Sequence, residues 1–160
     1  MKRALPAAEP GATLRYRVRE GHVLQVDDAT SARMARVRQK ATSPELLVGK
    51  ALRALGLRYR SKNRDLEGSP DFANRKARWA VFVHGCFWHR HGCSATTTPG
   101  RNREFWEAKF ARNRARDQRA AEALAARGFR VLVIWECETK RARPEELAQR
   151  LREAFASAQG

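Results

Sequence analysis

A short segment crowded with histidines and cysteines constrains this chain more than any other feature. Residues 84–93 contain three of the four histidines and two of the three cysteines, and the third cysteine is Cys137. Three cysteine thiolates and one imidazole form a common tetrahedral set for a structural zinc ion. The residues favour a zinc site formed by Cys86, Cys93, Cys137 and either His91 or His89. Three buried free cysteines are the alternative interpretation.

The net charge of the chain narrows the range of partners. Lysines and arginines number 33 against 17 acidic residues, which gives a formal net charge of +16. Each phosphate that a cationic side chain neutralises releases condensed counterions, so this excess favours DNA or RNA as a partner. An arginine-rich composition without a binding role is the alternative. No apolar signal segment or membrane-spanning stretch is apparent, and the odd cysteine count argues against a disulfide framework, so we expect a cytoplasmic protein.

Hydrophobic periodicity and turn residues predict an α/β domain. Thr42 and Glu45 have the spacing of a capping box, which opens a helix. We expect helices at 42–56, 103–127 and from 144 onward, and strands at 57–60, 71–73, 79–83 and 130–135. This order predicts one mixed central sheet flanked by helices, analogous to the restriction-endonuclease-like core. We assign the domain to residues 31–160 and a basic N-terminal arm to residues 1–30.

One aspartate and two histidines have the properties of a hydrolytic site. Asp71 follows a turn and starts a predicted strand, a position from which a carboxylate can bind Mg²⁺. Capping of the turn is its alternative role. Nucleases of this core usually carry a lysine on the neighbouring strand, but here that strand ends in Val83 and His84. Because the unperturbed pKa of histidine is about 6.5, His84 or His89 is the candidate general base.

Large aromatic residues lie among these polar residues. Phe87 and Trp88 separate candidate metal ligands, and Trp106 lies near the start of the predicted long helix. In a basic protein, exposed aromatic side chains can wedge between base pairs and stack on the bases. We interpret Phe87 and Trp88 as DNA-contacting residues. Core packing is a more serious alternative for Trp106 than for these two residues.

Several motifs between residues 31 and 138 resemble the very short patch repair (Vsr) family of DNA mismatch endonucleases. The run His-Gly-Cys-Phe-Trp-His at residues 84–89 is highly specific to that family. The other motifs include Thr42-Ser43-Pro44-Glu45-Leu46, Gly68-Ser69-Pro70-Asp71-Phe72, Phe105-Trp106 and Val133-Ile134-Trp135-Glu136-Cys137. The resemblance implies a restriction-endonuclease-like fold with a structural zinc. It also implies a Mg²⁺-dependent enzyme that nicks one strand on the 5′ side of the thymine in a T·G mismatch and leaves a 5′-phosphate.

The resemblance further implies roles for residues around the scissile phosphate. Asp71 binds Mg²⁺ together with the backbone carbonyl of Val83, which stands where family members often have threonine. His89 is the general base and is oriented by Asp117. The remaining contacts, to the phosphate and to metal-bound water, come from His84 and Glu45.

The same resemblance assigns the zinc ligands and the DNA contacts. The zinc ligands are Cys86, His91, Cys93 and Cys137, and the residues inserted into DNA are Phe87, Trp88 and Trp106 from the major groove and Met34 from the minor groove. We therefore predict a monomeric endonuclease that acts on mismatched double-stranded DNA, with Mg²⁺ as catalytic ion and Zn²⁺ as structural ion. The alternatives are a restriction-associated nickase of broader specificity and a non-catalytic, zinc-dependent DNA-binding module. Residues 1–30 have no counterpart in the resemblance, and we expect this arm to clamp the duplex and to order on DNA.

Overall fold

The computed structural model describes residues 15–37, 42–141 and 144–155. Its elements are β1 (Arg15–Arg19), β2 (His22–Val26), α1 (Asp28–Ala35), α2 (Ser43–Ala54), β3 (Phe72–Asn74), β4 (Trp79–His84), α3 (Cys86–His89), α4 (Arg103–Ala126), β5 (Arg130–Trp135), α5 (Glu136–Arg141) and α6 (Pro144–Phe155). All three predicted helices are confirmed, as are the last three of the four predicted strands. Although α4 is 24 residues long, no helix in the described ranges is apolar enough to cross a membrane.

Three strands form a mixed sheet in the order β3-β4-β5, which confirms the predicted α/β class. β4 pairs antiparallel with β3 and parallel with β5, and the last pair of the parallel ladder is His84 with Trp135. Parallel strands run in one direction, so β4 and β5 end at the same edge of the sheet. The segments that follow His84 and Trp135 therefore start side by side, although they are far apart in the sequence.

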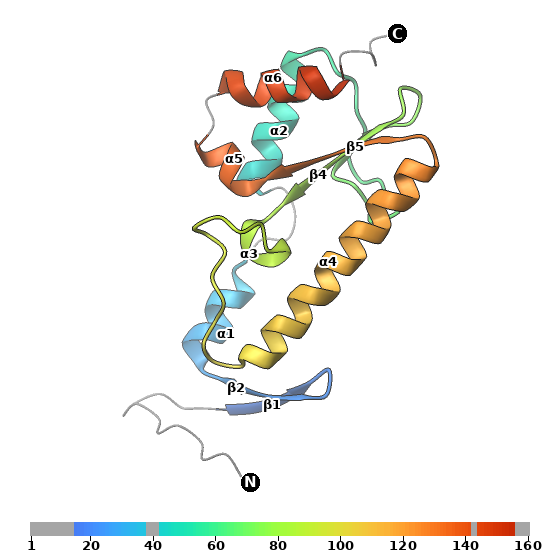
Figure 1. Ribbon diagram of the computed structural model, residues 1–160. Coiled ribbons are helices and arrows are strands. Elements are labelled where there is room, and N and C mark those ends of the chain that lie inside the picture. The colour runs from blue at the N-terminus through green and yellow to red at the C-terminus, as the bar shows by residue number, and fades with distance from the viewer. Residues whose placement is uncertain (1–14, 38–41, 142–143, 156–160) are drawn as a thin grey trace.

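Side chains of the central strand alternate between two hydrophobic cores. Trp79 and Val81 belong to the core that α2 and α6 cover, whereas Ala80 and Phe82 belong to the core under α4. Figure 1 shows the resulting layers, with α2 and α6 on one side of the sheet and α4 on the other. Both faces of β4 are covered, which explains its near-continuous apolar sequence.

The strand predicted at 57–60 is wrong, because only Arg60 makes an isolated bridge to the sheet. The following loop is instead held by the buried side chain of Asn63. Its amide nitrogen donates to the backbone carbonyls of Arg60 at 2.8 Å and Pro70 at 3.0 Å. A side chain that replaces a strand ladder in this way leaves no periodic signal in the sequence. The loop ends at Asp71, so Asn63 helps to fix the position of that carboxylate.

Gly68 brings the same loop close to α4. Its φ is +71°, and a Cβ at this position would lie 2.5 Å from the Cβ of Ala120. A larger residue would meet both an unfavourable backbone conformation and a clash with the helix. Gly68 therefore sets how closely α4, which carries Asp117, approaches the loop that carries Asp71.

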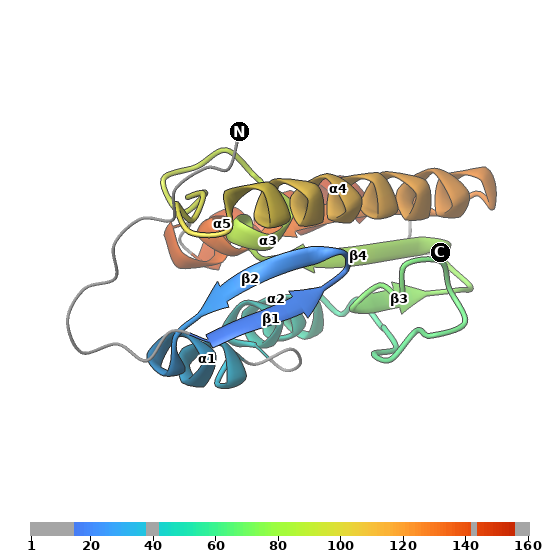
Figure 2. The ribbon, with the colours of Figure 1, turned by 90° about the horizontal axis from the view of Figure 1, so that it is seen from below.

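Within the predicted N-terminal arm of residues 1–30, residues 15–30 contain regular elements, and ordering of the arm on DNA stays a prediction. β1 and β2 pair as an antiparallel hairpin, and α1 follows directly. Two hydrogen bonds of 2.9 and 2.8 Å join the backbone of Gln25 to the side chain of Asn102 at the start of α4. Figure 1 shows the hairpin at the bottom of the molecule, and in Figure 2, which is seen from below, it lies in front, between α4 and α1. The remainder of the predicted arm, residues 1–14, lies outside the described residues.

Candidate active site and metal centre

Two groups of polar side chains form at the sheet edge where β4 and β5 end. The first, which we call the thiol cluster, contains Cys86, His91, Cys93 and Cys137. The second, the histidine cluster, contains His84, His89 and Asp117. In each cluster, the nitrogen, sulfur or oxygen atoms that can bind a metal all lie within 4.8 Å of one another.

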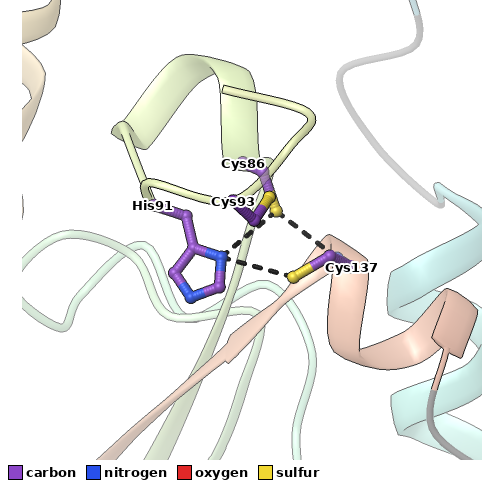
Figure 3. A group of neighbouring side chains, drawn as sticks. All are labelled: Cys86, His91, Cys93 and Cys137. Atoms are coloured by element: carbon purple, nitrogen blue, oxygen red, sulfur yellow. Dashed lines mark hydrogen bonds between the residues drawn. The ribbon is translucent and has the colours of Figure 1, made fainter. Parts of the chain in front are cut away.

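The thiol cluster joins the segments that follow the two strands, as Figure 3 shows. Nδ1 of His91 lies 3.3 Å from Sγ of Cys137 and 3.7 Å from Sγ of Cys86. The backbone N–H of Cys137 donates to Sγ of Cys86 at 3.4 Å. The ring of His91 stacks on Trp135, with centroids 4.3 Å apart and an interplanar angle of 13°. The structure therefore brings together the four residues predicted as zinc ligands and places His91, rather than His89, among them.

The surroundings give the thiols of Cys86 and Cys93 different pKa values. Burial raises the pKa of the Cys86 thiol to about 12. By contrast, the backbone N–H of Ala95 and the side chain of His91 lower the pKa of Cys93 to about 6. Metal ligation needs deprotonated thiols, so a cation in this cluster would stabilise the thiolate that Cys86 otherwise resists forming. Three sulfurs and one nitrogen fit a closed tetrahedral site for Zn²⁺.

His89 pairs with Asp117, which α4 supplies from the other side of the site. Nδ1 of His89 and Oδ2 of Asp117 form a short hydrogen bond, and the two side chains are only 18% and 20% exposed. Burial alone would favour the protonated acid, but the hydrogen bond with His89 keeps the pKa of Asp117 below its usual value. Asp117 is therefore ionised and accepts a hydrogen bond from Nδ1–H. This tautomer leaves Nε2 as the basic atom of His89.

His84 is buried against His89 with its ring parallel to it. The ring centroids are 3.9 Å apart and the interplanar angle is 6°. Burial, together with the neighbouring His89, lowers the pKa of His84 to about 4. The imidazole of His84 therefore stays neutral near pH 7. Trp135 meets His84 edge-on, at 5.5 Å between centroids, and so lies between the two clusters.

Asp71 lies beside the histidine cluster, immediately before β3. Its Oδ2 accepts a hydrogen bond of 2.7 Å from the backbone N–H of Val83. Burial and the negative charge of Glu45 raise the pKa of Asp71 to about 6, against the effect of that hydrogen bond. Two carboxylates in a partly buried space repel each other, and a divalent cation between them would remove this repulsion.

Glu45 takes part in this site instead of completing the predicted capping box. Thr42 is the N-cap of α2, but its side chain accepts no hydrogen bond from the helix backbone. Its hydroxyl donates to Oε1 of Glu45 at 2.9 Å. The helix start was predicted correctly, and the carboxylate in its first turn is turned toward the site.

Phe87, Trp88 and Trp106 lie in one aromatic cluster between α3 and α4. The centroid of Phe87 is 5.0 Å from that of Trp88, 5.7 Å from that of Trp106 and 5.2 Å from that of Phe110. The three predicted residues are half-buried, neither fully exposed nor part of the core. The ammonium of Lys109 lies over the rings of Trp88 and Trp106 at 5.1 and 5.2 Å. A half-exposed group of rings with one cation suits stacking on bases next to a phosphate.

Met34, the remaining predicted DNA contact, is half-buried in the last turn of α1. The sequence did not single out Arg116, whose guanidinium lies 3.5 Å from Oδ1 of Asp117. It also gave Trp135 no role, although its ring contacts a histidine of each cluster. Their only sequence signal was adjacency, since Arg116 directly precedes a candidate catalytic acid and Trp135 lies two residues before a candidate ligand.

Comparison with known proteins gives consistent matches. Residues 24–95 match the family model of the DNA mismatch endonuclease Vsr. Vsr of Escherichia coli (strain K12) is 37% identical over 131 residues, which cover 79% of this chain and 84% of that protein. A type II nicking enzyme of Xanthomonas oryzae pv. oryzae is 48% identical over 105 residues, covering 66% of this chain and 77% of that enzyme. A type II nicking enzyme of Neisseria meningitidis serogroup A is 41% identical over 107 residues, covering 67% and 76%.

Proposed function

The chain belongs to the Vsr family of endodeoxyribonucleases, and on this premise we propose that it nicks one DNA strand on the 5′ side of the thymine in a T·G mismatch. The product carries a 5′-phosphate. The observation that carries this proposal is the histidine cluster, in which an ionised acid orients a basic histidine beside the carboxylate of Asp71. This arrangement suits hydrolysis of a phosphodiester by an activated water.

Asp71 is the residue best suited to hold a catalytic Mg²⁺. Burial and the nearby charge of Glu45 raise its pKa, a divalent cation would offset both effects, and oxygen ligands are those that Mg²⁺ prefers. The backbone carbonyl of Val83 is the second proposed ligand, and the hydrogen bond from its N–H to Asp71 keeps the two residues adjacent. A bound Mg²⁺ would supply positive charge for the scissile phosphate. Glu45 would orient water around the ion.

His89 removes the proton from the attacking water in this proposal. Asp117 accepts a hydrogen bond from Nδ1–H and thereby directs the lone pair of Nε2 away from α4. The imidazolium that forms is stabilised by the adjacent carboxylate, as in other histidine–acid pairs. His84, which stays neutral, would donate or accept a hydrogen bond at the phosphate without adding a second charge next to His89.

The thiol cluster would hold a structural Zn²⁺. Its donors come from the ends of two strands, so a bound ion would fix the segment from the start of α3 to Cys93 against the start of α5. That segment carries His89 and the aromatic residues Phe87 and Trp88. We propose that zinc supports the catalytic side chains through this brace, within a restriction-endonuclease-like fold.

The aromatic cluster would recognise the distorted base pair. Phe87, Trp88 and Trp106 are half-buried in the free protein, and their exposed edges would stack on bases unstacked at a mismatch. We propose that Met34 of α1 contacts the duplex from the other groove. Unstacking costs less at a mismatch than in paired DNA, which provides a basis for selectivity.

A second candidate function is nicking in association with a restriction system. The observation that favours it is the 48% identity to a type II nicking enzyme. Both functions use the same catalytic residues, so they differ only in which duplexes are cut.

A nicking assay over a panel of duplexes tests the proposal. Strand-labelled duplexes with T·G, the other mismatches and full pairing are incubated with the protein and Mg²⁺, with EDTA, and with the Asp71→Ala variant. We expect cleavage of the thymine strand on its 5′ side, for T·G only, in Mg²⁺. Cutting of all mismatches would support the broader nickase, and cutting that persists in EDTA or in Asp71→Ala would contradict the proposed mechanism.

A further inference from the structure

Cationic side chains form a row along the side of α4 that adjoins the hairpin. Lys109, Arg112, Arg116 and Arg119 are three or four positions apart and so share one side of the helix. Together with Glu20 of the hairpin turn and Asn113, they line an open hollow of about 460 Å³. The row reaches the active site, because Arg116 lies 3.5 Å from Asp117.

The hairpin extends this row by at least one cation. Arg19 pairs with His22 in the ladder, so their side chains share a face of the hairpin. The ring of His22 contacts Phe105 of α4, with centroids 5.7 Å apart, so this face is turned toward the helix. Burial and then the positive charge of Arg19 lower the pKa of Lys109, which also places Arg19 beside the start of the row.

Glu20 lines the hollow and pairs with one of the cationic residues of the row. Glu20 forms an ion pair with Arg112, and the two side chains are 46% and 52% exposed. An exposed pair of this kind contributes little to stability and is easily exchanged for another anion. A phosphate group would replace the carboxylate and bind Arg112 in the same geometry.

Resting on the proposed function, we infer that Arg19, Lys109, Arg112, Arg116 and Arg119 bind the backbone phosphates of the duplex next to the scissile bond. From Lys109 to Arg119 the helix rises about 15 Å, at about 1.5 Å per residue, which matches the axial rise of about four base-pair steps of the duplex at about 3.4 Å each. These contacts position the duplex and carry no sequence information.

The test measures the salt dependence of DNA affinity. The triple variant Arg19→Gln/Arg112→Gln/Arg119→Gln is compared with the control triple Arg58→Gln/Arg114→Gln/Arg152→Gln, which removes the same charge from exposed positions outside the row. Fluorescence anisotropy with a T·G duplex and a fully paired duplex gives log Kd against log salt concentration. Each lost phosphate contact lowers the slope by about 0.9, so we expect a decrease of about 2.7 for the row variant on both duplexes. The control triple should keep the wild-type slope.

Glu20→Gln provides a test in the opposite direction. Removing the competing carboxylate should tighten binding and steepen the salt slope, whereas Glu145→Gln on α6 should change neither. An unchanged slope in the row triple, an equal decrease in the control triple, or weaker binding by Glu20→Gln would overturn the inference. The nicking assay separates the two hypotheses. If the wild-type protein does not nick mismatched DNA but the salt slope decreases in the row triple, the proposed function alone is refuted. If the wild-type protein nicks mismatched DNA and the salt slope is unchanged in the row triple, this inference alone is refuted.

Discussion

The thiol cluster and the histidine cluster both include residues at the end of β4, but the first is suited to binding a metal ion and the second to transferring a proton. His89 and His91 are two residues apart, but His89 pairs with an acid of α4 and His91 lies among three sulfur atoms. The residue between them explains the separation. Arg90 ends α3 in a left-handed conformation, with φ +57°, and turns the chain so that the second histidine faces the other cluster. The left-handed residue therefore separates the histidine that pairs with Asp117 from the histidine that lies among the thiols.

The difference also teaches what each cluster needs from its surroundings. A structural zinc site requires only that its donor atoms surround the ion. The thiol cluster accordingly consists of segments at one sheet edge. The proposed hydrolytic site instead combines groups from several elements: Asp71 before β3, His84 of β4, His89 of α3 and Asp117 of α4. Variants of the two clusters should therefore separate activity from stability.

Asp71→Ala should have the largest effect on activity. It removes the proposed anchor of the catalytic cation, whose charge is worth several kcal/mol in such sites, so we expect nicking to fall by about 10⁴-fold or more. DNA binding and zinc content should remain at wild-type levels, because the residue lies outside the thiol cluster. Single-turnover nicking, anisotropy and metal analysis of one preparation measure all three. Near-normal nicking in Mg²⁺ would remove Asp71 from the mechanism.

His89→Ala and His91→Ala form the sharpest matched pair. Loss of a general base slows a reaction by about 10²- to 10⁴-fold, so His89→Ala should lose activity and keep both its zinc and its melting temperature. His91→Ala should lose zinc and thermal stability. The readouts are nicking rate, zinc content and thermal unfolding. If both variants lost zinc alike, the division into two clusters would be wrong.

Cys137→Ala should lower stability more than any change in the histidine cluster. Structural metal binding contributes directly to folding, and loss of one ligand should reduce the free energy of unfolding by on the order of 3 kcal/mol. For a chain of this length, that corresponds to a decrease in melting temperature of about 10 °C. Differential scanning calorimetry with and without added zinc measures the change, and Cys137→His, which restores a ligand, is the control. A protein that lost zinc without losing stability would show that the cluster does not brace the fold.

The pH dependence of Asp71 should give the smallest effect. Its pKa rises from 3.8 to about 6 on folding, so the folded state binds this proton more tightly than the unfolded chain. Its contribution to stability is complete below pH 3.8 and is lost as the pH rises through about 6. Without divalent cations, Asp71→Asn should therefore melt a few degrees above wild type at pH 8 and at the same temperature at pH 4. A thermal shift of the same size at both pH values would contradict the origin proposed for the raised pKa.

The elements that could be predicted from the sequence are those with a continuous local pattern. The apolar run of β4 and the strong helix signals of α4 and α6 identified the layers of the domain. The bridge at Arg60 and the loop held by Asn63 depend on one buried side chain that reaches distant carbonyls, which no local pattern records. The hairpin was missed because β1 is exposed along its whole length and the hairpin is held by contacts with α4, neither of which gives a hydrophobic pattern.

The candidate site could be predicted as a set of residues but not as an arrangement. Residue types and spacing identified the cysteines and histidines of the two clusters, whereas Asp117 and the choice of His91 over His89 came from the family resemblance. The stacking of His84 on His89 and the position of Trp135 depend on the register of β4 with β5, which is set by the fold as a whole.

The register of β4 with β5 has a consequence for how the chain folds. Cys86 follows β4 and Cys137 follows β5, and a slip of one residue between the strands would turn Trp135 and the start of α5 to the opposite faces of the sheet. A misaligned chain would then lack a complete set of soft ligands. A zinc ion bound there would therefore act as a checkpoint that only correctly aligned chains pass. Because the same alignment brings the proposed catalytic histidine His84 beside Trp135, a misaligned chain would lack both the proposed zinc site and the proposed catalytic site.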